Sequence, residues 1–259
     1  MRRCRERSRI SHSAAIARCG GVVSLCGIAR THPPLSTRFT VDDGHDVPLG
    51  HDRRPFWRGR VHLFALWLAL PAMTILIGAA DGARARIGCT IYASGLCSMF
   101  LVSTAYHRWV HGLRARATWR RADHAAIFAA IAGSATPLAL VTMAPRTGLA
   151  LVLVLWATVI PGMMLKLGRW HHGDVAGTVL YFVLSAECIA LLPALHRAEG
   201  IVPVALCFAS GGIYIVGAIL FGLKRPTLRP GRFGFHEFWH LMTVVAAATH
   251  FVAVWITCV

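Results

Sequence analysis

The sequence predicts an all-α integral membrane protein: a bundle of seven transmembrane helices with its N-terminus in the cytoplasm and its C-terminus outside. Three observations support this prediction. The chain of 259 residues is 56% hydrophobic and only 15% charged, a composition typical of membrane proteins. From Val61 onward, apolar runs of about 20 residues alternate with short polar connections, and each run is long enough to cross about 30 Å of hydrocarbon as a helix. Arginine is concentrated in every second connection.

Two parts of the chain differ in composition. Residues 1–54 are rich in Arg, Ser, His, Pro and Gly, and their longest apolar stretch, Gly20 to Ala29, is too short to span a bilayer. We expect a basic, disordered cytoplasmic extension there, followed by a seven-helix membrane domain over residues 55–259. The stretch from Ile10 to Ala29 resembles a signal peptide, but Arg18 interrupts it and no small-residue cleavage site follows. A start codon assigned too far upstream would explain the composition equally well.

The apolar runs give the predicted membrane spans in order. Their approximate limits are 61–80, 88–107, 123–143, 148–167, 175–195, 202–223 and 236–257. Pro161 lies inside the fourth run and is expected to kink it. A helix bundle tolerates such a kink when neighbouring helices satisfy the freed carbonyl group.

The positions of the basic residues set the expected orientation. The connections after the second, fourth and sixth runs are strongly basic, whereas the alternate connections hold only Arg84 and Arg86, then Arg146, then Arg197. Because lysine and arginine are retained on the cytoplasmic side, the N-terminus is expected inside. This orientation is opposite to that of G-protein-coupled receptors. The residues of the basic connections are Arg108, Arg114, Arg116, Arg120, Arg121, Lys166, Arg169, Lys224, Arg225, Arg229 and Arg232.

The net charge of +16 does not indicate nucleic-acid binding. It comes almost wholly from arginine, because Lys166 and Lys224 are the only lysines, and the arginines lie between apolar runs instead of along one basic face. The eight cysteines include no CxxC pair, and most fall inside apolar runs. The sequence therefore indicates neither a disulfide framework nor a cysteine zinc site.

Polar residues at the ends of three apolar runs form the candidate site. His236 and His240 are four residues apart, so on a helix their imidazoles share one face and can bind one metal ion. In the predicted topology, His107 ends the second run and Asp123 begins the third at the same cytoplasmic surface. Three neutral imidazoles with a water molecule make a catalytic type of zinc site, in which a nearby carboxylate orients and deprotonates the water. We predict His107, His236 and His240 as Zn²⁺ ligands. Asp123 is the predicted carboxylate that contacts the water, and Ser103 is a hydrogen-bonding neighbour.

Simpler explanations exist for each of these residues. Histidine and aspartate at helix ends commonly serve as interfacial anchors and caps, and Asp123 could be a favourable negative group at a helix N-terminus. The convergence of the whole set on one membrane face favours metal binding. The segment His236 to His240 also satisfies H-E-x-x-H, the zinc-protease pattern with Glu237 as general base. No Asp or Glu follows Glu237, so an intramembrane protease would need Asp123 or His107 as its third ligand.

Other polar residues are expected outside the site. His250 is about four helical turns beyond His236, too far to reach the same ion, and is expected to be a packed intramembrane polar group. Glu187 lies inside the fifth run, where an ionisable group suggests a function, but the sequence shows no partner for it. The histidines expected at the polar surface or in local hydrogen bonds are His62, His111, His124, His171 and His172.

Several motifs in order along the chain carry a resemblance. Together they resemble the bacterial hemolysin III proteins, which belong with the progestin and adipoQ receptors in a superfamily of membrane hydrolases that includes alkaline ceramidases. The resemblance covers about residues 55–257 and implies seven helices with the N-terminus inside. The motifs are Ser103-Thr104-Ala105-Tyr106-His107-Arg108, Asp123-His124-Ala125-Ala126-Ile127-Phe128, Ala132-Gly133-Ser134-Ala135-Thr136-Pro137, Lys224-Arg225-Pro226 and Gly234-Phe235-His236-Glu237-Phe238-Trp239-His240.

The resemblance also implies roles for single residues. The zinc-binding histidines of the family correspond to His107, His236 and His240, and its site serine and aspartate correspond to Ser103 and Asp123. The receptor branch commonly has glutamine at the position of Glu237, which argues against an essential base there. The chain departs from the family at Trp239, where phenylalanine is more usual, and at Glu187, in a helix that is normally apolar. Neither departure concerns the proposed ligands.

Three functions of different classes follow from these observations. The first is a zinc-dependent hydrolase of lipid amide or ester bonds, embedded in the bacterial inner (plasma) membrane with its metal near the cytoplasmic face. The second is permeabilisation of membranes by oligomeric, cytolytic pores, the activity for which hemolysin III proteins were named, although no amphipathic lumen-lining helix stands out. The third is a non-catalytic regulator of membrane lipid state in which zinc is a structural clasp. Membrane lipids are the expected partners, and nucleic acid is not expected to bind. The sequence does not decide whether the protein forms a homo-oligomer.

Overall fold

The computed structural model describes residues 38–41, 45–48, 55–168 and 173–259. The chain divides into two compact units, Met1–Arg53 and Arg54–Val259. In the first unit, β1 (Arg38–Val41) pairs antiparallel with β2 (His45–Pro48), a pairing that the sequence patterns did not predict. Most of the extension expected over residues 1–54 lies outside the described residues, so its disorder stays a prediction.

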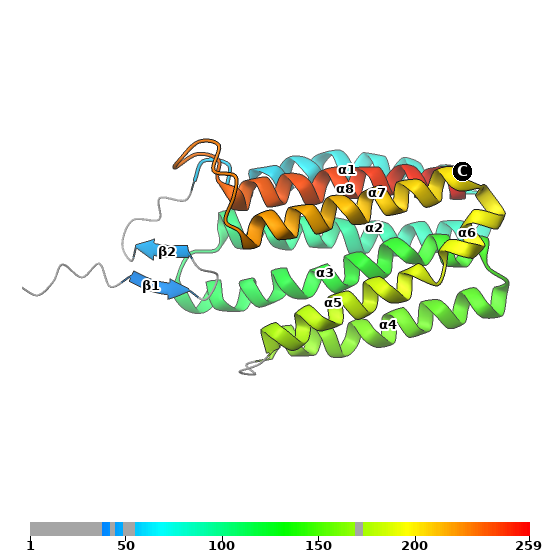
Figure 1. Ribbon diagram of the computed structural model, residues 1–259, viewed down its shortest axis with the longest axis horizontal. Coiled ribbons are helices and arrows are strands. Elements are labelled where there is room, and N and C mark those ends of the chain that lie inside the picture. Colours follow the sequence, from blue (N-terminus) through cyan, green and yellow to red (C-terminus); the bar gives the residue numbers. More distant parts are fainter. Residues whose placement is uncertain (1–37, 42–44, 49–54, 169–172) are drawn as a thin grey trace, which may run out of the picture. The chain divides into compact units, whose positions relative to one another are not determined.

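The described residues of the second unit form seven helical spans long and apolar enough to cross a membrane, which confirms the predicted all-α transmembrane fold. The helices lie side by side in one bundle (Figure 1). The second span is α2 continued by the short π-helix η1, and the fifth comprises most of α5 together with α6. The elements are α1 (Arg60–Ala79), α2 (Gly82–Thr104), η1 (Ala105–Trp109), α3 (Leu113–Thr142), α4 (Pro145–Leu167), α5 (Gly173–Ile189), α6 (Leu192–Glu199), α7 (Ile201–Gly222) and α8 (Phe235–Cys258).

The third helix begins ten residues earlier than the apolar pattern predicted. It starts at Leu113, so Asp123 lies in about its third turn and not at its N-terminus. The segment before Asp123 consists largely of arginine and alanine, which are good helix formers, and the helix therefore extends beyond the apolar run into the polar region. Asp123 is therefore not a group at the N-terminus of the helix.

The fifth predicted span is interrupted. α5 ends at Ile189, and α6 begins at Leu192 with Pro193 in its first turn, a position where proline is favoured. Tighter i→i+3 hydrogen bonds, from Ala190 N to Glu187 O (3.1 Å) and from Leu191 N to Cys188 O (3.3 Å), form the break. In contrast, α4 continues through Pro161 to Leu167.

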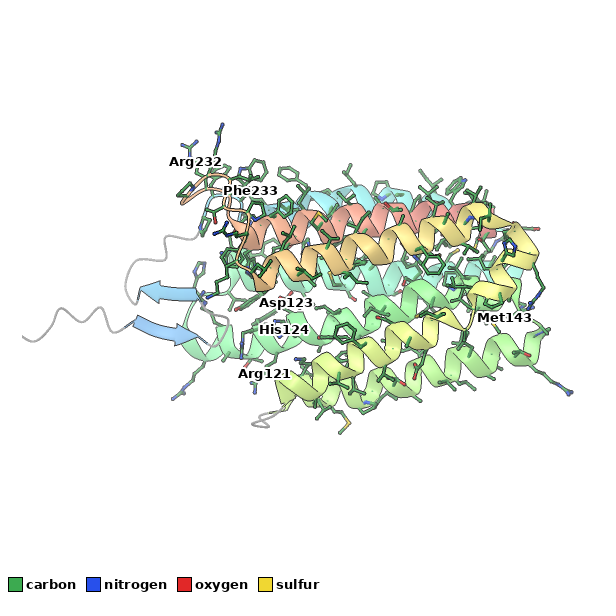
Figure 2. All side chains as sticks on the ribbon, in the orientation of Figure 1. Arg121, Asp123, His124, Met143, Arg232 and Phe233 are labelled. Atoms are coloured by element: carbon green, nitrogen blue, oxygen red, sulfur yellow. The ribbon has the colours of Figure 1, made fainter. Side chains whose placement is uncertain are left out.

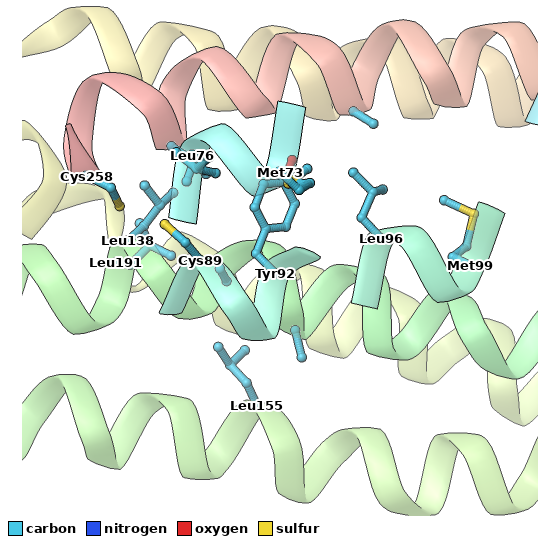
Figure 3. Close-up of a cluster of buried hydrophobic side chains, with 14 of the residues drawn as sticks. Met73, Leu76, Cys89, Tyr92, Leu96, Met99, Leu138, Leu155, Leu191 and Cys258 are labelled. Carbon is cyan, nitrogen blue, oxygen red and sulfur yellow. The ribbon is translucent and has the colours of Figure 1, made fainter. Parts of the chain in front are cut away.

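Small residues bring α2 and α3 into close contact. A Cβ atom on Gly95 would lie 2.5 Å from the carbonyl oxygen of Ala129, so only glycine permits this approach. Tyr92, Leu76 and Leu138 are fully buried in the adjoining apolar core (Figure 3). Large apolar side chains on the outside of the bundle, such as Leu68 at 73% exposure, are suited to contact with lipid.

The end of η1, the start of α3 and the start of α8 lie at one end of the bundle, which is called the site end below (Figure 1). Asp123 and Arg232 lie at the site end and Met143 lies at the other (Figure 2). The helix arrangement thus brings together the ends that the predicted topology placed at one depth. The assignment of the site end to the cytoplasm stays a prediction.

Candidate metal centre

Three histidines form a buried cluster at the site end. His107, His236 and His240 are 6%, 9% and 5% exposed, and each offers a ring nitrogen within 4.8 Å of the others. His236 and His240 lie in the first two turns of α8, whereas His107 comes from η1, more than 120 residues earlier. The three histidines chosen from the sequence are therefore positioned to hold a metal ion.

The spacing of the imidazoles fits zinc. The Nε2 atoms of His107 and His236 are 3.3 Å apart. Two nitrogens that each lie about 2.0–2.1 Å from one tetrahedral zinc ion are separated by about 3.3–3.4 Å, although a hydrogen bond between neutral rings has a similar length. The Nε2 atom of His240 is buried and has no hydrogen-bond partner among the described residues. Because an unsatisfied buried nitrogen is destabilising, a metal ion at this point would supply its missing partner.

A π-helical turn positions His107. The turn is closed by a hydrogen bond of 3.0 Å from Val110 N to Ala105 O, an i→i+5 pattern that is rare and often found at functional sites. Gly59, with a φ of 71°, packs directly over this turn. A Cβ atom on Gly59 would lie 2.9 Å from the His107 Cβ atom. Glycine therefore lets the start of α1 lie close against the ligand-bearing turn.

Asp123 and Ser103 lie beside the histidines. The Oδ2 atom of Asp123, on α3, is 3.9 Å from His107 Nε2. At this distance the carboxylate can accept a hydrogen bond from a water molecule that also contacts the cluster. Ser103, in the last turn of α2, is 1% exposed; its hydroxyl adjoins the Asp123 carboxyl but makes no hydrogen bond of normal length within the described residues. All five residues predicted for the site thus lie in one region.

His62 is a member of the site that the sequence analysis missed. It was expected at the surface or in a local hydrogen bond, but it is 3% exposed and contacts a residue 178 positions away. Its Nε2 atom is 3.1 Å from His240 Nδ1 and 3.0 Å from Thr243 Oγ1. When His240 carries its proton on Nδ1 and donates it to His62, its Nε2 lone pair points to the cluster, as in other histidine metal sites. One sequence feature could have identified His62 as a site residue: it lies at the start of the first apolar run, at the site end.

Known proteins resemble this chain in sequence. A family model of haemolysin-III related proteins matches residues 51–251. The chain belongs to the haemolysin-III related family. It is 28% identical over 190 residues to hemolysin-3 of Bacillus cereus, which covers 72% of this chain and 84% of that protein. It is 25% identical over 201 residues to the hemolysin-3 homolog of Bacillus subtilis (strain 168), covering 76% and 91%, and 25% identical over 199 residues to the human monocyte to macrophage differentiation factor, covering 75% and 80%.

Family membership and the seven apolar helices together establish the location of this haemolysin-III related chain. It is a multi-pass integral membrane protein of the bacterial inner membrane. The family match includes every residue of the histidine cluster, together with His62, Ser103 and Asp123. It begins at residue 51, close to the boundary between the two compact units.

In this haemolysin-III related chain, Glu237 belongs to the structure of α8 and not to the histidine cluster. Its carboxylate is 1% exposed and accepts hydrogen bonds from Arg58 Nε (2.6 Å) and from the backbone N–H of Gly234 (2.8 Å). The second bond is half of a capping box at the start of the helix. Because both oxygens are engaged, the H-E-x-x-H pattern does not supply a general base here.

The remaining polar residues lie outside the centre. His250 Nε2 is 3.1 Å from the carbonyl oxygen of Ser134, which confirms the expected packed polar group. Glu187, which had no visible partner in the sequence, accepts a hydrogen bond of 2.9 Å from Thr158 Oγ1 on α4. His124 and His111 are not part of the cluster, and the backbone carbonyl of His124 accepts a hydrogen bond from Tyr181. His171 and His172 lie outside the described residues.

Proposed function

We propose that this protein is a zinc-dependent membrane hydrolase that cleaves an amide or ester bond of a lipid. The observation that carries the proposal is the convergence of three buried imidazoles and the Asp123 carboxylate at one end of a membrane-embedded bundle. When bound, a zinc ion would activate a water molecule and polarise the carbonyl group of the substrate. Lipid is the substrate class that suits a centre surrounded by apolar helices.

The protein groups have separate tasks in this proposal. His107, His236 and His240 hold the metal, and His62 fixes the ring of His240. The Asp123 carboxylate orients the water and accepts its proton, acting as a general base. Asp123 is 15% exposed, more than any of the three histidines, so access to the centre is easiest on the side of α3.

Replacing Asp123 by Asn tests the hydrolase. The amide has the size of the carboxyl but cannot act as a base, so turnover should fall by about 100-fold or more while bound zinc is unchanged. The measurement is fatty-acid release, by mass spectrometry, from liposomes that contain ceramide amides or phospholipid esters. Glu187→Gln, a matched loss of a carboxylate outside the centre, should leave release unchanged. No fatty-acid release by zinc-loaded wild type, or equal release by the Asp123 variant, would contradict the proposal.

Replacing His62 by Phe tests the support of His240. The change keeps a ring but removes the acceptor for His240 Nδ1, so zinc affinity should fall by about 10- to 100-fold. The affinity is measured by competition with a chromophoric chelator, which requires no activity. His250→Phe, the same change at a partly buried histidine outside the cluster, serves as control. Equal affinity in wild type and the His62 variant would show that His62 only fills space.

Two further functions have a specific observation in their favour. The low exposure of the three histidines suits a structural clasp in a non-catalytic regulator of membrane lipid state. The name of the Bacillus cereus relative, hemolysin-3, suggests membrane permeabilisation. Dye release from substrate-free liposomes would favour permeabilisation. Zinc binding without fatty-acid release from any lipid would favour the clasp.

A further inference from the structure

A groove runs between α1 and α8 on the outer surface at the site end, and it is separate from the histidine cluster. Its volume is about 530 Å³. Its walls are apolar: α1 contributes Val61, Phe64 and Leu68, and α8 contributes Leu241 and Val244. Among the described residues that line it, Arg229, in the connection between α7 and α8, is the only charged one. The groove thus combines one cation with a long apolar surface.

The groove runs along two helices that are long and apolar enough to cross a membrane. From Val61 to Leu68 the helix rises about 10 Å, or about one third of the hydrocarbon thickness. Phe64 and Leu68 are 56% and 73% exposed, so the apolar surface is accessible from the membrane. Trp57 and Phe233 line the end of the groove nearest Arg229, where aromatic side chains are favoured at the level of lipid headgroups.

Arg229 is held in place by a short hairpin. Its backbone N–H donates to the carbonyl of Phe233 (2.9 Å), and the N–H of Phe233 donates back to Arg229 (2.8 Å). The ring of Phe233 packs against the ring of Trp57, with centroids 6.5 Å apart. The backbone N–H of Trp57 donates a hydrogen bond to the carbonyl oxygen of Arg232 (3.3 Å). The connection that carries the cation is therefore fastened to the segment that precedes α1.

The charge at the groove mouth is not neutralised within the described part of the chain. Arg229 is exposed, as are Arg225 and Arg232 in the same connection, and none of them pairs with a described acidic side chain. The neighbouring Arg58 is occupied by Glu237, and Arg60 is occupied by the carbonyl oxygen and ring of Phe56. An anionic group is the complement that the groove mouth lacks.

We propose that this groove binds an anionic phospholipid. The phosphate accepts hydrogen bonds from the Arg229 guanidinium, and one acyl chain lies along α1 and α8 toward Leu68 and Val244. A lipid is favoured over free phosphate because the groove continues about 10 Å along apolar side chains beyond Arg229. The site does not depend on the metal. Val61 and Leu241 adjoin His62 and His240 in sequence, so the bound lipid would pack against the two helices that carry this histidine pair.

The test is native mass spectrometry of the detergent-purified full chain with phosphatidylglycerol or phosphatidylcholine of identical acyl chains. We expect wild type to retain phosphatidylglycerol preferentially, and Arg229→Gln to weaken this retention about fivefold, the effect of one arginine at a membrane surface. Arg114→Gln removes an exposed arginine from the site end away from the groove and should retain the lipid like wild type. Zinc content should be equal in all three proteins. The lipid-binding result therefore does not depend on whether the protein is a zinc hydrolase.

Three outcomes would overturn the proposal. Equal retention of the two lipids would show that the groove does not recognise negative charge. Equal losses in the Arg229 and Arg114 variants would indicate general surface electrostatics. Displacement of the lipid by millimolar inorganic phosphate would indicate an anion site that makes no use of the apolar walls.

Discussion

Replacing both His236 and His240 by alanine is expected to reduce bound zinc from about one ion per chain to almost none. Each substitution removes one of the three ring nitrogens that lie within 4.8 Å of one another. His107 alone cannot bind the ion tightly. Elemental analysis of detergent-purified protein measures the metal directly. Fatty-acid release should disappear together with the zinc.

A folded control makes this result interpretable. His250→Ala removes a partly buried histidine from the same helix without touching the cluster, so this variant should keep its zinc. Circular dichroism should show similar helix content in all the proteins. Well-folded wild-type protein that contains no zinc after purification in zinc-supplemented buffer would refute both the hydrolase and the zinc clasp, and would leave membrane permeabilisation as the better account.

Replacing Arg58 by alanine is expected to lower the free energy of unfolding by about 3 kcal/mol. The change leaves the Glu237 carboxylate, which is 1% exposed, without the partner that lies 2.6 Å away. Breaking a buried ion pair on one side is strongly destabilising because the remaining charge stays desolvated. Since Arg58 itself is 14% exposed, we expect an effect at the lower end of the range for such pairs. Unfolding in SDS, followed by circular dichroism, provides the measurement.

A double-mutant cycle isolates the ion pair. In a Glu237→Gln background, which retains an oxygen to accept from Gly234 N–H, Arg58→Ala should cost much less than in wild type. Arg114→Ala, at an exposed arginine with no acidic partner among the described residues, should change stability by less than about 0.5 kcal/mol. Equal effects of Arg58→Ala in both backgrounds would mean that the pair contributes nothing specific.

The seven spans and the histidine cluster could be predicted from the sequence because each follows from a local rule. A run of about 20 apolar residues has to form a helix in a bilayer, since its backbone polar groups have no other partners there. His236 and His240 share a helix face by spacing alone. Once seven spans fix which ends lie together, His107 and Asp123 fall at the same end of the bundle.

Other features depend on contacts that the sequence pattern does not contain. The start of α3 was misplaced because hydropathy marks where a chain enters lipid, whereas arginine and alanine continue the helix beyond it. The π-turn at His107 does not follow from residue spacing. The pairing of His62 with His240 joins residues 178 positions apart, and neither local sequence indicates that the two residues are in contact. The same holds for Arg58 and Glu237.

The links between α1 and α8 have a consequence for biogenesis. Arg58 and His62 belong to the beginning of the membrane domain, whereas Glu237 and His240 belong to its final span. A growing chain therefore inserts its first helix long before the partners of that helix leave the ribosome. The histidine cluster is therefore incomplete until α8 enters the bilayer. In the proposed zinc protein, metal loading follows insertion of α8, and chains that stop before α8 should carry no zinc.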